Sequence, residues 1–136
     1  MERTLVILKP DAVERGLTGE ILSRLEAKQL RLTASELRTI DVVTAQRHYA
    51  EHEGKPFYAN LVAFITSGPA LVCVVEGTAD TWKVVRNLMG ATDPKDAAPG
   101  TIRGDLALNM AQNLIHGSDS PESAQREIEI FFPELA

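Results

Sequence analysis

The stretch Asn113-Leu-Ile-His-Gly-Ser-Asp-Ser-Pro-Glu-Ser123 is the part of the sequence on which our interpretation of the fold depends most. In it, a short apolar run ends at His116, and a glycine and several small polar residues follow. Ser120 or Asp119 is placed to cap the N-terminus of a helix, and Pro121 suits the first turn of that helix. The stretch therefore predicts a short strand that leads through a tight loop into the last helix.

His116 carries the clearest chemical signal in this stretch. Because an imidazole loses its proton near neutral pH, it can act as a nucleophile without a strongly perturbed pKa. Glu127 lies on the second turn of the predicted helix, from which its carboxylate could return to the ring and fix the tautomer. From the local pattern alone, a surface histidine beside an ordinary helix cap is the more common arrangement.

Two continuous apolar runs, residues 5–8 and 70–75, predict central strands that are buried on both faces. The first run stops at Lys9, whose ammonium would lie at the end of the strand, where it could bind a phosphate oxygen or simply be solvated. Residues 30–40 alternate between apolar and polar positions, with a break in phase near Ser35. We therefore predict a half-buried edge strand with a bulge.

Four further helices are predicted before the last one, three from the helical spacing of apolar residues and one, at 44–53, as a short polar helix. They cover residues 18–30, 44–53, 56–68 and 78–89. The second and third form a helical hairpin, which could be either a movable lip over a cleft or a packed helical layer. The last helix would bury Ala124, Ile128 and Phe131.

Residues 90–113 form a long segment with little periodicity beyond a possible short helix at 104–110. Irregular segments of this length inside compact domains are usually functional or disordered. Thr92, Arg103 and Asn113 therefore lie where an active-site loop is expected.

The composition is that of an ordinary globular protein: 136 residues, 44% hydrophobic and 24% charged, with a formal charge of −5. We expect a single domain over residues 1–136. Net acidity argues against binding of specific nucleic acids. Cys73, the only cysteine, lies within an apolar run and is expected to be a buried, inert thiol. The sequence has no signal-like N-terminus and no apolar run near the ~20 residues of a membrane span, so we expect a cytoplasmic protein.

The order of the elements contains the βαββαβ pattern of ferredoxin-like folds. The fold class predicted is therefore α+β: a sandwich with a four-stranded antiparallel sheet, a helical hairpin insertion and a long active-site loop.

Several polar and aromatic side chains have the chemistry of a nucleotide site. Cations form charge-assisted hydrogen bonds with phosphates, and an aromatic ring can stack on any base. Besides His116, the candidates are the cations Lys9, Arg86 and Arg103, the donors Thr92 and Asn113, and the aromatic Phe57. The sequence contains neither a GxxxxGK[ST] loop nor the motifs of protein kinases, so side chains must bind the phosphates.

The motif at residues 113–119 resembles the active-site signature of nucleoside diphosphate kinases, Asn-x-x-His-Gly-Ser-Asp. Further matches occur in the order found in that family. They are Glu2-Arg-Thr4, Lys9-Pro-Asp11, Arg15-Gly16, Gly19-Glu-Ile21, Pro56-Phe57, Ser67-Gly-Pro69, Gly90-Ala-Thr-Asp-Pro94 and Pro99-Gly-Thr-Ile-Arg-Gly-Asp105. The chain differs from the family pattern by one additional residue between Gly77 and Arg86.

This resemblance implies the ferredoxin-like fold and a ping-pong reaction, in which His116 takes the γ-phosphoryl group of a nucleoside triphosphate and passes it to a nucleoside diphosphate. Mg2+ would arrive with the nucleotide phosphates, without a metal cage made by the protein. Family members assemble as dimers, tetramers or hexamers, so a homo-oligomer is implied. The family roles that transfer to matching positions are phosphate and sugar binding for Lys9, Tyr49, Arg86, Thr92, Arg103 and Asn113, base stacking for Phe57, and support of the histidine for Ser118 and Glu127.

Two other functions are compatible with such a fold. One is a non-catalytic, nucleotide-binding regulatory module, since a fold alone does not fix a function. The presence of both His116 and Lys9 argues against it. The other is a phosphohistidine carrier that accepts phosphate from a protein partner, which would leave Phe57, Thr92 and Asn113 without a role.

Overall fold

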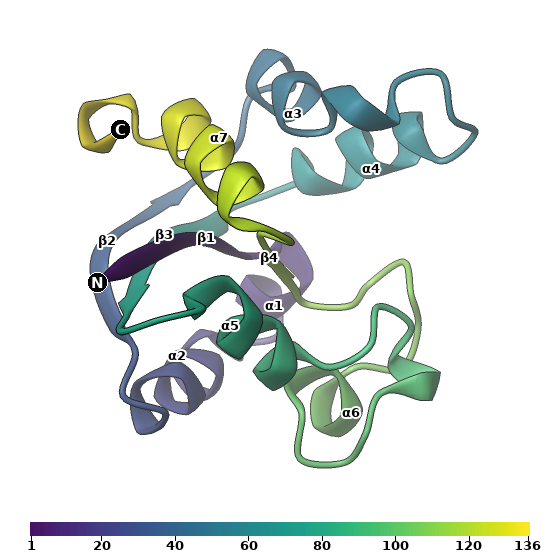
Figure 1. Ribbon diagram of the computed structural model, residues 1–136. Helices are drawn as coiled ribbons and strands as arrows, with labels where there is room; N and C mark the ends of the chain where they lie inside the picture. Colours follow the sequence, from purple (N-terminus) through teal and green to yellow (C-terminus); the bar gives the residue numbers. More distant parts are fainter.

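The computed structural model describes residues 1–136, which form a four-stranded sheet covered by helices on both faces (Figure 1). In chain order the elements are β1 (Glu2–Leu8), α1 (Pro10–Glu14), α2 (Thr18–Ala27), β2 (Arg31–Arg38), α3 (Val42–His48), a 3-10 turn (Ala50–His52), α4 (Tyr58–Ile65), β3 (Ala70–Gly77), α5 (Thr81–Met89), a 3-10 turn (Pro94–Asp96), α6 (Ile102–Leu106), β4 (Ile115–Gly117), α7 (Pro121–Phe131) and a 3-10 turn (Pro133–Leu135). No helix in this set is both long and apolar enough to cross a lipid bilayer.

The sheet has the strand order β2-β3-β1-β4, and every neighbouring pair is antiparallel. This arrangement confirms the predicted ferredoxin-like α+β fold. β1 and β3 occupy the two inner positions and are paired along their full lengths, from Glu2↔Gly77 to Leu8↔Leu71. The two continuous apolar runs are thus the central strands, as predicted.

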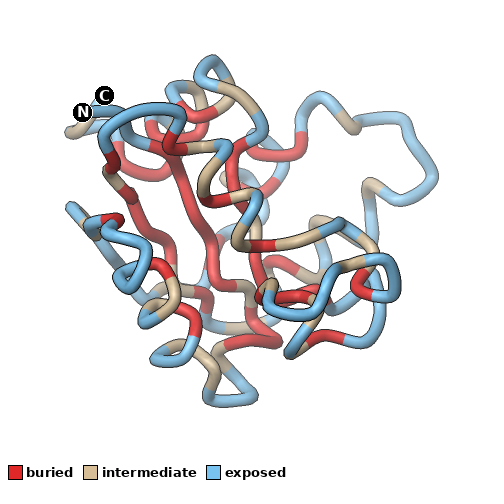
Figure 2. The backbone as a smooth tube through the Cα atoms, turned by 60° about the horizontal axis from the view of Figure 1, so that its bottom comes forward, coloured by how far each residue is buried: buried red, intermediate tan, exposed pale blue.

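Side chains alternate along the inner strands between two apolar cores, one on each face of the sheet. Val6 and Leu8 face a core that includes residues from α1, α2, α5 and α6. Leu5 and Ile7 face a second core with α3, α4 and α7 (Figure 1). Buried residues are concentrated along these strands (Figure 2). Cys73 is buried in β3, and burial raises the pKa of its thiol to about 12, in agreement with the expected inert cysteine.

The structure differs from the sequence-based boundaries in a few places. The bulge in β2 lies between Leu32 and Ala34, slightly before the predicted position. α6 begins at Ile102, earlier than predicted, because Thr101 caps it by accepting a hydrogen bond from the backbone of Gly104 (3.0 Å). A short helix, α1, was not predicted; Pro10 at its first position starts it directly after β1.

The ends of β1 and β4 bring the strand-end lysine beside the histidine. Ile7 is paired with His116, and the backbone N–H of Lys9 donates to the carbonyl of Leu114 (2.8 Å). Leu114 adopts a left-handed conformation (φ 74°), which is unfavourable for a branched residue. The carboxylate of Asp11 supports it by accepting a hydrogen bond from the Leu114 N–H (3.1 Å). This turn sets the direction in which the chain enters β4.

Candidate active site

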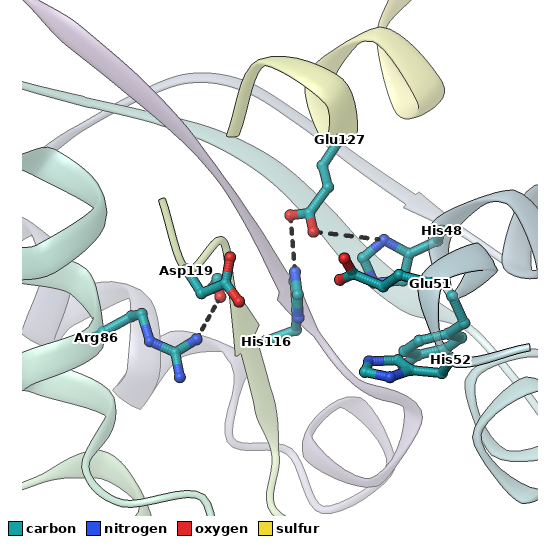
Figure 3. A pocket seen from close by; sticks show the side chains of 9 residues that line it. His48, Glu51, His52, Arg86, His116, Asp119 and Glu127 are labelled. Atoms are coloured by element: carbon teal, nitrogen blue, oxygen red, sulfur yellow. Dashed lines mark hydrogen bonds and ion pairs between the residues drawn. The ribbon is translucent and has the colours of Figure 1, made fainter. Parts of the chain in front are cut away.

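A cavity of about 160 Å³ lies between the end of β4 and helices α3, α5 and α7 (Figure 3). Its lining is almost entirely polar. The lining residues are His48, Tyr49, Glu51, His52, Arg86, His116, Gly117, Asp119 and Glu127. Of the residues predicted for the site, the cavity therefore contains His116, Glu127, Tyr49 and Arg86.

His116 is held from α7 by a direct contact with a buried carboxylate. Its Nε2 lies 2.9 Å from Oε1 of Glu127, and the same oxygen accepts a hydrogen bond from the hydroxyl of Ser118 (2.6 Å). Ser118 is in turn fixed to β1, because its hydroxyl accepts from the backbone N–H of Leu5 (3.3 Å). The N-cap Ser120, which accepts from the N–H of Ser123 (3.0 Å), sets the start of α7 and hence the position of Glu127.

The ionisation of Glu127 determines which nitrogen of His116 is free. Burial raises the pKa of Glu127, but the hydrogen bonds from His116 and Ser118 and the electrostatic influence of His116 and His48 outweigh burial and lower it to about 2. At neutral pH the carboxylate is ionised and only accepts hydrogen bonds. In the neutral form of His116 the proton is therefore on Nε2, and Nδ1 keeps the lone pair.

His48 packs against His116 and Glu127 but makes no hydrogen bond. Its ring lies edge-on to His116, with centroids 4.6 Å apart, and its Nδ1 is 3.9 Å from Oε2 of Glu127. Burial lowers the pKa of His48 to about 3, and nearby His116 and Arg126 add to this effect despite the opposing charge of Glu127. His48 is thus neutral at physiological pH, and the close approach to Glu127 is not an ion pair.

Beside the cavity, four of the predicted phosphate-binding residues form a connected group around Asn113. Its Oδ1 accepts from Nζ of Lys9 (2.9 Å), and its Nδ2 donates to the carbonyl of Thr92 (2.9 Å). Arg103 is buried and donates to the carbonyls of Asn113, Gly90 and Ile115 (3.2, 3.1 and 2.6 Å). The side chain of Asn113 therefore connects the loop at Thr92 to Lys9 at the end of β1.

The cations of the site lie close enough to influence one another. Burial and then the charge of Arg103 lower the pKa of Lys9 to about 8, against the opposing effect of Asp11. Burial and then the charge of Arg86 lower the pKa of Arg103 to about 10. Arg86 on α5 donates from Nη1 to the carbonyl of Gly117 (2.8 Å), directly after His116. The additional residue before Arg86 thus leaves this side chain at the cavity.

Phe57 lies outside the cavity lining. Its side chain is 46% exposed, and its ring contacts His52 edge-on with centroids 5.4 Å apart. His52 in turn lies 6.3 Å from the ring of Tyr49, which is buried and has its pKa raised to about 12, mainly by burial. A row of rings thus leads from the exposed Phe57 into the cavity.

The acidic residues of the cavity do not form a cage for Mg2+. The only group of three side chains close enough to share an ion is His48, His116 and Glu127, and two of its ligand atoms are imidazole nitrogens. Mg2+ prefers six oxygen ligands and retains several waters. With two imidazole nitrogens and one carboxylate, this set does not match the ligands that Mg2+ prefers.

Several residues that line the cavity were not predicted from the sequence to belong to the site. His48, Glu51 and His52 come from α3 and the turn after it, where the spacing gave no sign that they face His116. Asp119 is part of the motif at 113–119, which was the one signal that could have identified it.

The acid sensitivity of His48 gives a testable consequence. Its pKa is about 3 in the folded protein and about 6.5 unfolded, so the unfolded chain binds an additional proton between these values and stability falls as the pH falls through this window. From pH 7 to pH 4, we expect this group alone to remove about 3 kcal/mol. The substitution His48→Leu should remove that part of the pH dependence, as measured by urea unfolding at both pH values. Parallel stability profiles for the two proteins would contradict this account of His48.

Comparison with known proteins identifies the family. The family model described as nucleoside diphosphate kinase matches residues 2–136. A nucleoside diphosphate kinase of Thermomicrobium roseum is 61% identical over 98% of this chain and 89% of its own length, and one of Thermobifida fusca is 57% identical over 100% of both. Among solved structures, a halophilic nucleoside diphosphate kinase from Halobacterium salinarum in complex with CDP has a TM-score of 0.93 at 55% identity, over 96% of this chain and 87% of that one. The chain therefore belongs to the nucleoside diphosphate kinase family.

Proposed function

We propose that this chain catalyses its family's phosphoryl transfer through a phosphohistidine on His116. Family membership assigns the overall reaction, nucleoside diphosphate kinase activity, and makes the chain a phosphotransferase. The observation that carries the proposal is the 2.9 Å contact between Nε2 of His116 and the ionised Glu127. This contact leaves the lone pair of Nδ1 for attack.

In the first half-reaction, Nδ1 of His116 forms a bond to the γ-phosphorus of a nucleoside triphosphate. The bond from that phosphorus to the β–γ bridging oxygen breaks, and its electron pair leaves with the nucleoside diphosphate. In the second half-reaction, a terminal oxygen of a different diphosphate attacks the phosphorus and the P–N bond breaks. The histidine is then regenerated without a net proton change at Nε2.

Glu127 would stabilise this chemistry electrostatically. As Nδ1 bonds to phosphorus, the ring becomes cationic, and a carboxylate 2.9 Å from Nε2 opposes that charge in a buried environment. The hydrogen bond from Ser118 keeps the carboxylate in place before the reaction begins. We regard Glu127 and Ser118 as positioning residues and His116 as the nucleophile.

The phosphates would be bound by the cations around the end of β4. Arg86 faces the cavity, while Lys9, Arg103 and Asn113 form the adjoining connected group. Thr92 on the same loop is exposed and could donate its hydroxyl. Tyr49 would provide a further hydroxyl inside the cavity.

Phe57 is proposed as the stacking surface for the base. An exposed ring without a base-specific donor stacks on any base, so purine and pyrimidine nucleotides should be accepted with modest differences. The CDP in the complex from Halobacterium salinarum supports a nucleoside diphosphate as one substrate. Mg2+ is the proposed cofactor; when bound to the phosphates, it neutralises charge that develops on them during transfer.

We further propose that the chain forms a homo-oligomer. β2 is an edge strand with one side unpaired, and Leu37 on it is 62% exposed. Val42 and Val43, which follow shortly after, are also exposed. An open edge with apolar side chains favours pairing with another copy of the same strand.

The nucleophile is tested with ATP labelled at the γ-phosphate. The wild-type protein should become labelled and should transfer the label to any added nucleoside diphosphate, whereas His116→Ala should not be labelled but should still bind nucleotide. The label should be lost in acid and kept in base, as expected for a phosphoramidate. A label that is stable in acid, or substantial exchange by His116→Ala, would show that another residue carries the phosphate.

The role of Glu127 is tested by Glu127→Gln, which keeps the size of the side chain and removes its charge. Single-turnover phosphoenzyme formation should slow by tens- to hundreds-fold, as is typical when a residue that orients a functional histidine is changed. Nucleotide affinity should change much less. The variant should remain well above His116→Ala, and a rate equal to wild type would leave Glu127 without a catalytic effect.

The oligomer is tested by light scattering. Wild-type protein should have at least twice the 14.9 kDa mass of one chain. Leu37→Lys should lower the mass by placing a charge on the β2 edge, while Leu108→Lys, at a loop residue that is 92% exposed, should leave it unchanged. A wild-type mass of one chain, or equal masses for the wild type and Leu37→Lys, would contradict assembly through β2.

A further inference from the structure

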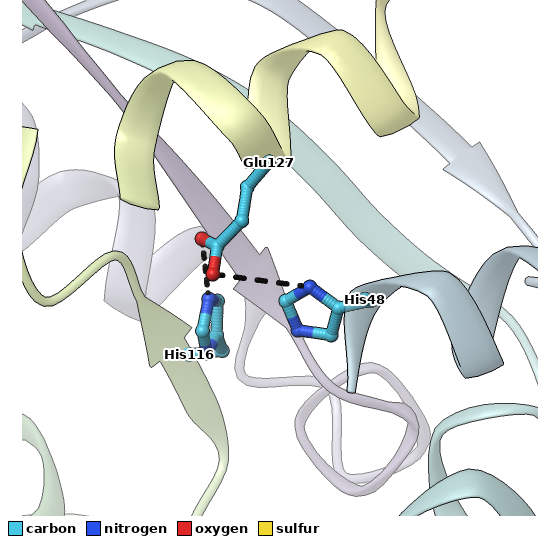
Figure 4. Close-up of side chains that lie close together, drawn as sticks. All are labelled: His48, His116 and Glu127. Carbon is cyan, nitrogen blue, oxygen red and sulfur yellow. Dashed lines mark hydrogen bonds and ion pairs between the residues drawn. The ribbon is translucent and has the colours of Figure 1, made fainter. Parts of the chain in front are cut away.

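We propose that His48, His116 and Glu127 form a binding site for Zn2+ that blocks His116 as a nucleophile. The three side chains come from α3, β4 and α7, point toward one another (Figure 4) and line the cavity. We call this set the zinc site. It is separate from the nucleotide-bound Mg2+ proposed above, because its ligands are imidazoles and one buried carboxylate.

The spacing of the ligand atoms is close to what a tetrahedral ion requires. One ligand atom from each residue lies within 4.8 Å of the other two. The individual separations include 2.9 Å between His116 Nε2 and Glu127 Oε1 and 3.9 Å between His48 Nδ1 and Glu127 Oε2. Ligands about 2.0–2.1 Å from Zn2+ lie about 3.3 Å apart, so separations of up to 4.8 Å must shorten by as much as about 1.5 Å through side-chain rotation.

His48 provides the independent observation that points to a ligand. Its side chain is 1% exposed, and neither of its ring nitrogens has a hydrogen-bond partner. Buried polar atoms in folded proteins are usually satisfied, and an unpaired one is unfavourable. A metal ion at the zinc site would take up the lone pair of Nδ1, which faces Glu127.

The donor set selects the class of ion. Two imidazoles and one carboxylate are the protein ligands of known catalytic zinc sites, which keep a fourth position for water. Here the fourth position would open into the cavity. Mg2+ prefers oxygen ligands and binds imidazole poorly, so millimolar Mg2+ should not compete. Arg126 lies 3.6 Å from Oε2 of Glu127, and its charge should weaken the affinity without preventing binding.

Zinc binding would change the tautomer of His116. A neutral imidazole has one lone pair, and in the active form it is on Nδ1 because Nε2–H donates to Glu127. When Zn2+ accepts the lone pair of Nε2, the Nε2 proton moves through solvent to Nδ1. No lone pair then remains on the ring for attack on phosphorus, and Glu127 no longer accepts a hydrogen bond from it.

Binding is measured first, by calorimetric titration of Zn2+ into the nucleotide-free protein, so that the result does not depend on the proposed phosphoryl transfer. Wild-type protein should bind one ion per chain. His48→Leu should lose at least about tenfold in affinity, as expected on removal of one ligand. His52→Leu is the matched control, because it removes another imidazole from the same cavity but leaves the zinc site intact.

A second measurement requires no variant. Co2+ added to the wild-type protein should give visible absorption of the intensity typical of four-coordinate cobalt, and Zn2+ should abolish it. Absence of saturable Zn2+ binding, or equal affinity in the wild type and His48→Leu, would overturn the site, as would cobalt spectra of a purely six-coordinate, aqueous type.

The effect on chemistry is then tested with zinc-loaded protein freed of excess metal and mixed with Mg2+ and γ-labelled ATP. Phosphoenzyme formation in a single turnover should fall at least about tenfold relative to metal-free protein, and a zinc-selective chelator should restore it. His48→Leu treated in the same way should keep its own metal-free rate. An undiminished rate in protein shown to retain zinc would overturn the proposed block while leaving the binding site intact.

Discussion

The buried carboxylate of Glu127 is the group on which the arrangement of the site depends. It accepts from Ser118 and His116, and Ser118 is fixed to β1 by the backbone of Leu5. A buried carboxylate without such partners would take up a proton, whereas here its pKa falls to about 2. The helix cap that starts α7, the register of β4 against β1 and the charge state of the site are therefore linked through one side chain.

The parts of the fold that could be predicted from the sequence are those set by local signals. Apolar runs and caps are local signals, so the inner strands were predicted correctly, as was the start of α7, whose N-cap is Ser120, one of the two residues proposed for it. The start of α6 was predicted late because its cap, Thr101, lies within an otherwise irregular segment. The bulge in β2 lies a few residues before its predicted position, because edge strands tolerate shifts in register that do not alter the core.

In the site, too, a contact between residues close in sequence could be predicted, whereas a contact made only by tertiary packing could not. The contact between His116 and Glu127 could be predicted because a short loop joins them, and the structure has it directly. His48 is 68 residues before His116, so no spacing relates them, and only the packing of α3 against α7 brings the rings together. The family motif pointed to His116, the proposed nucleophile, whereas the neutral His48 behind it required the structure.

The chain is acidic overall, yet three of its cations lie together at one place in the fold. Lys9, Arg86 and Arg103 surround the ends of β1 and β4, and each is held by hydrogen bonds to an amide or to backbone carbonyls. These neutral acceptors hold the cations without cancelling their charge, so the positive potential is available to an entering phosphate. Burial, and then repulsion from Arg103, lower the pKa of Lys9 to about 8. An anion bound beside Lys9 would raise that pKa again, so binding of a phosphate at the proposed site would relieve part of this repulsion.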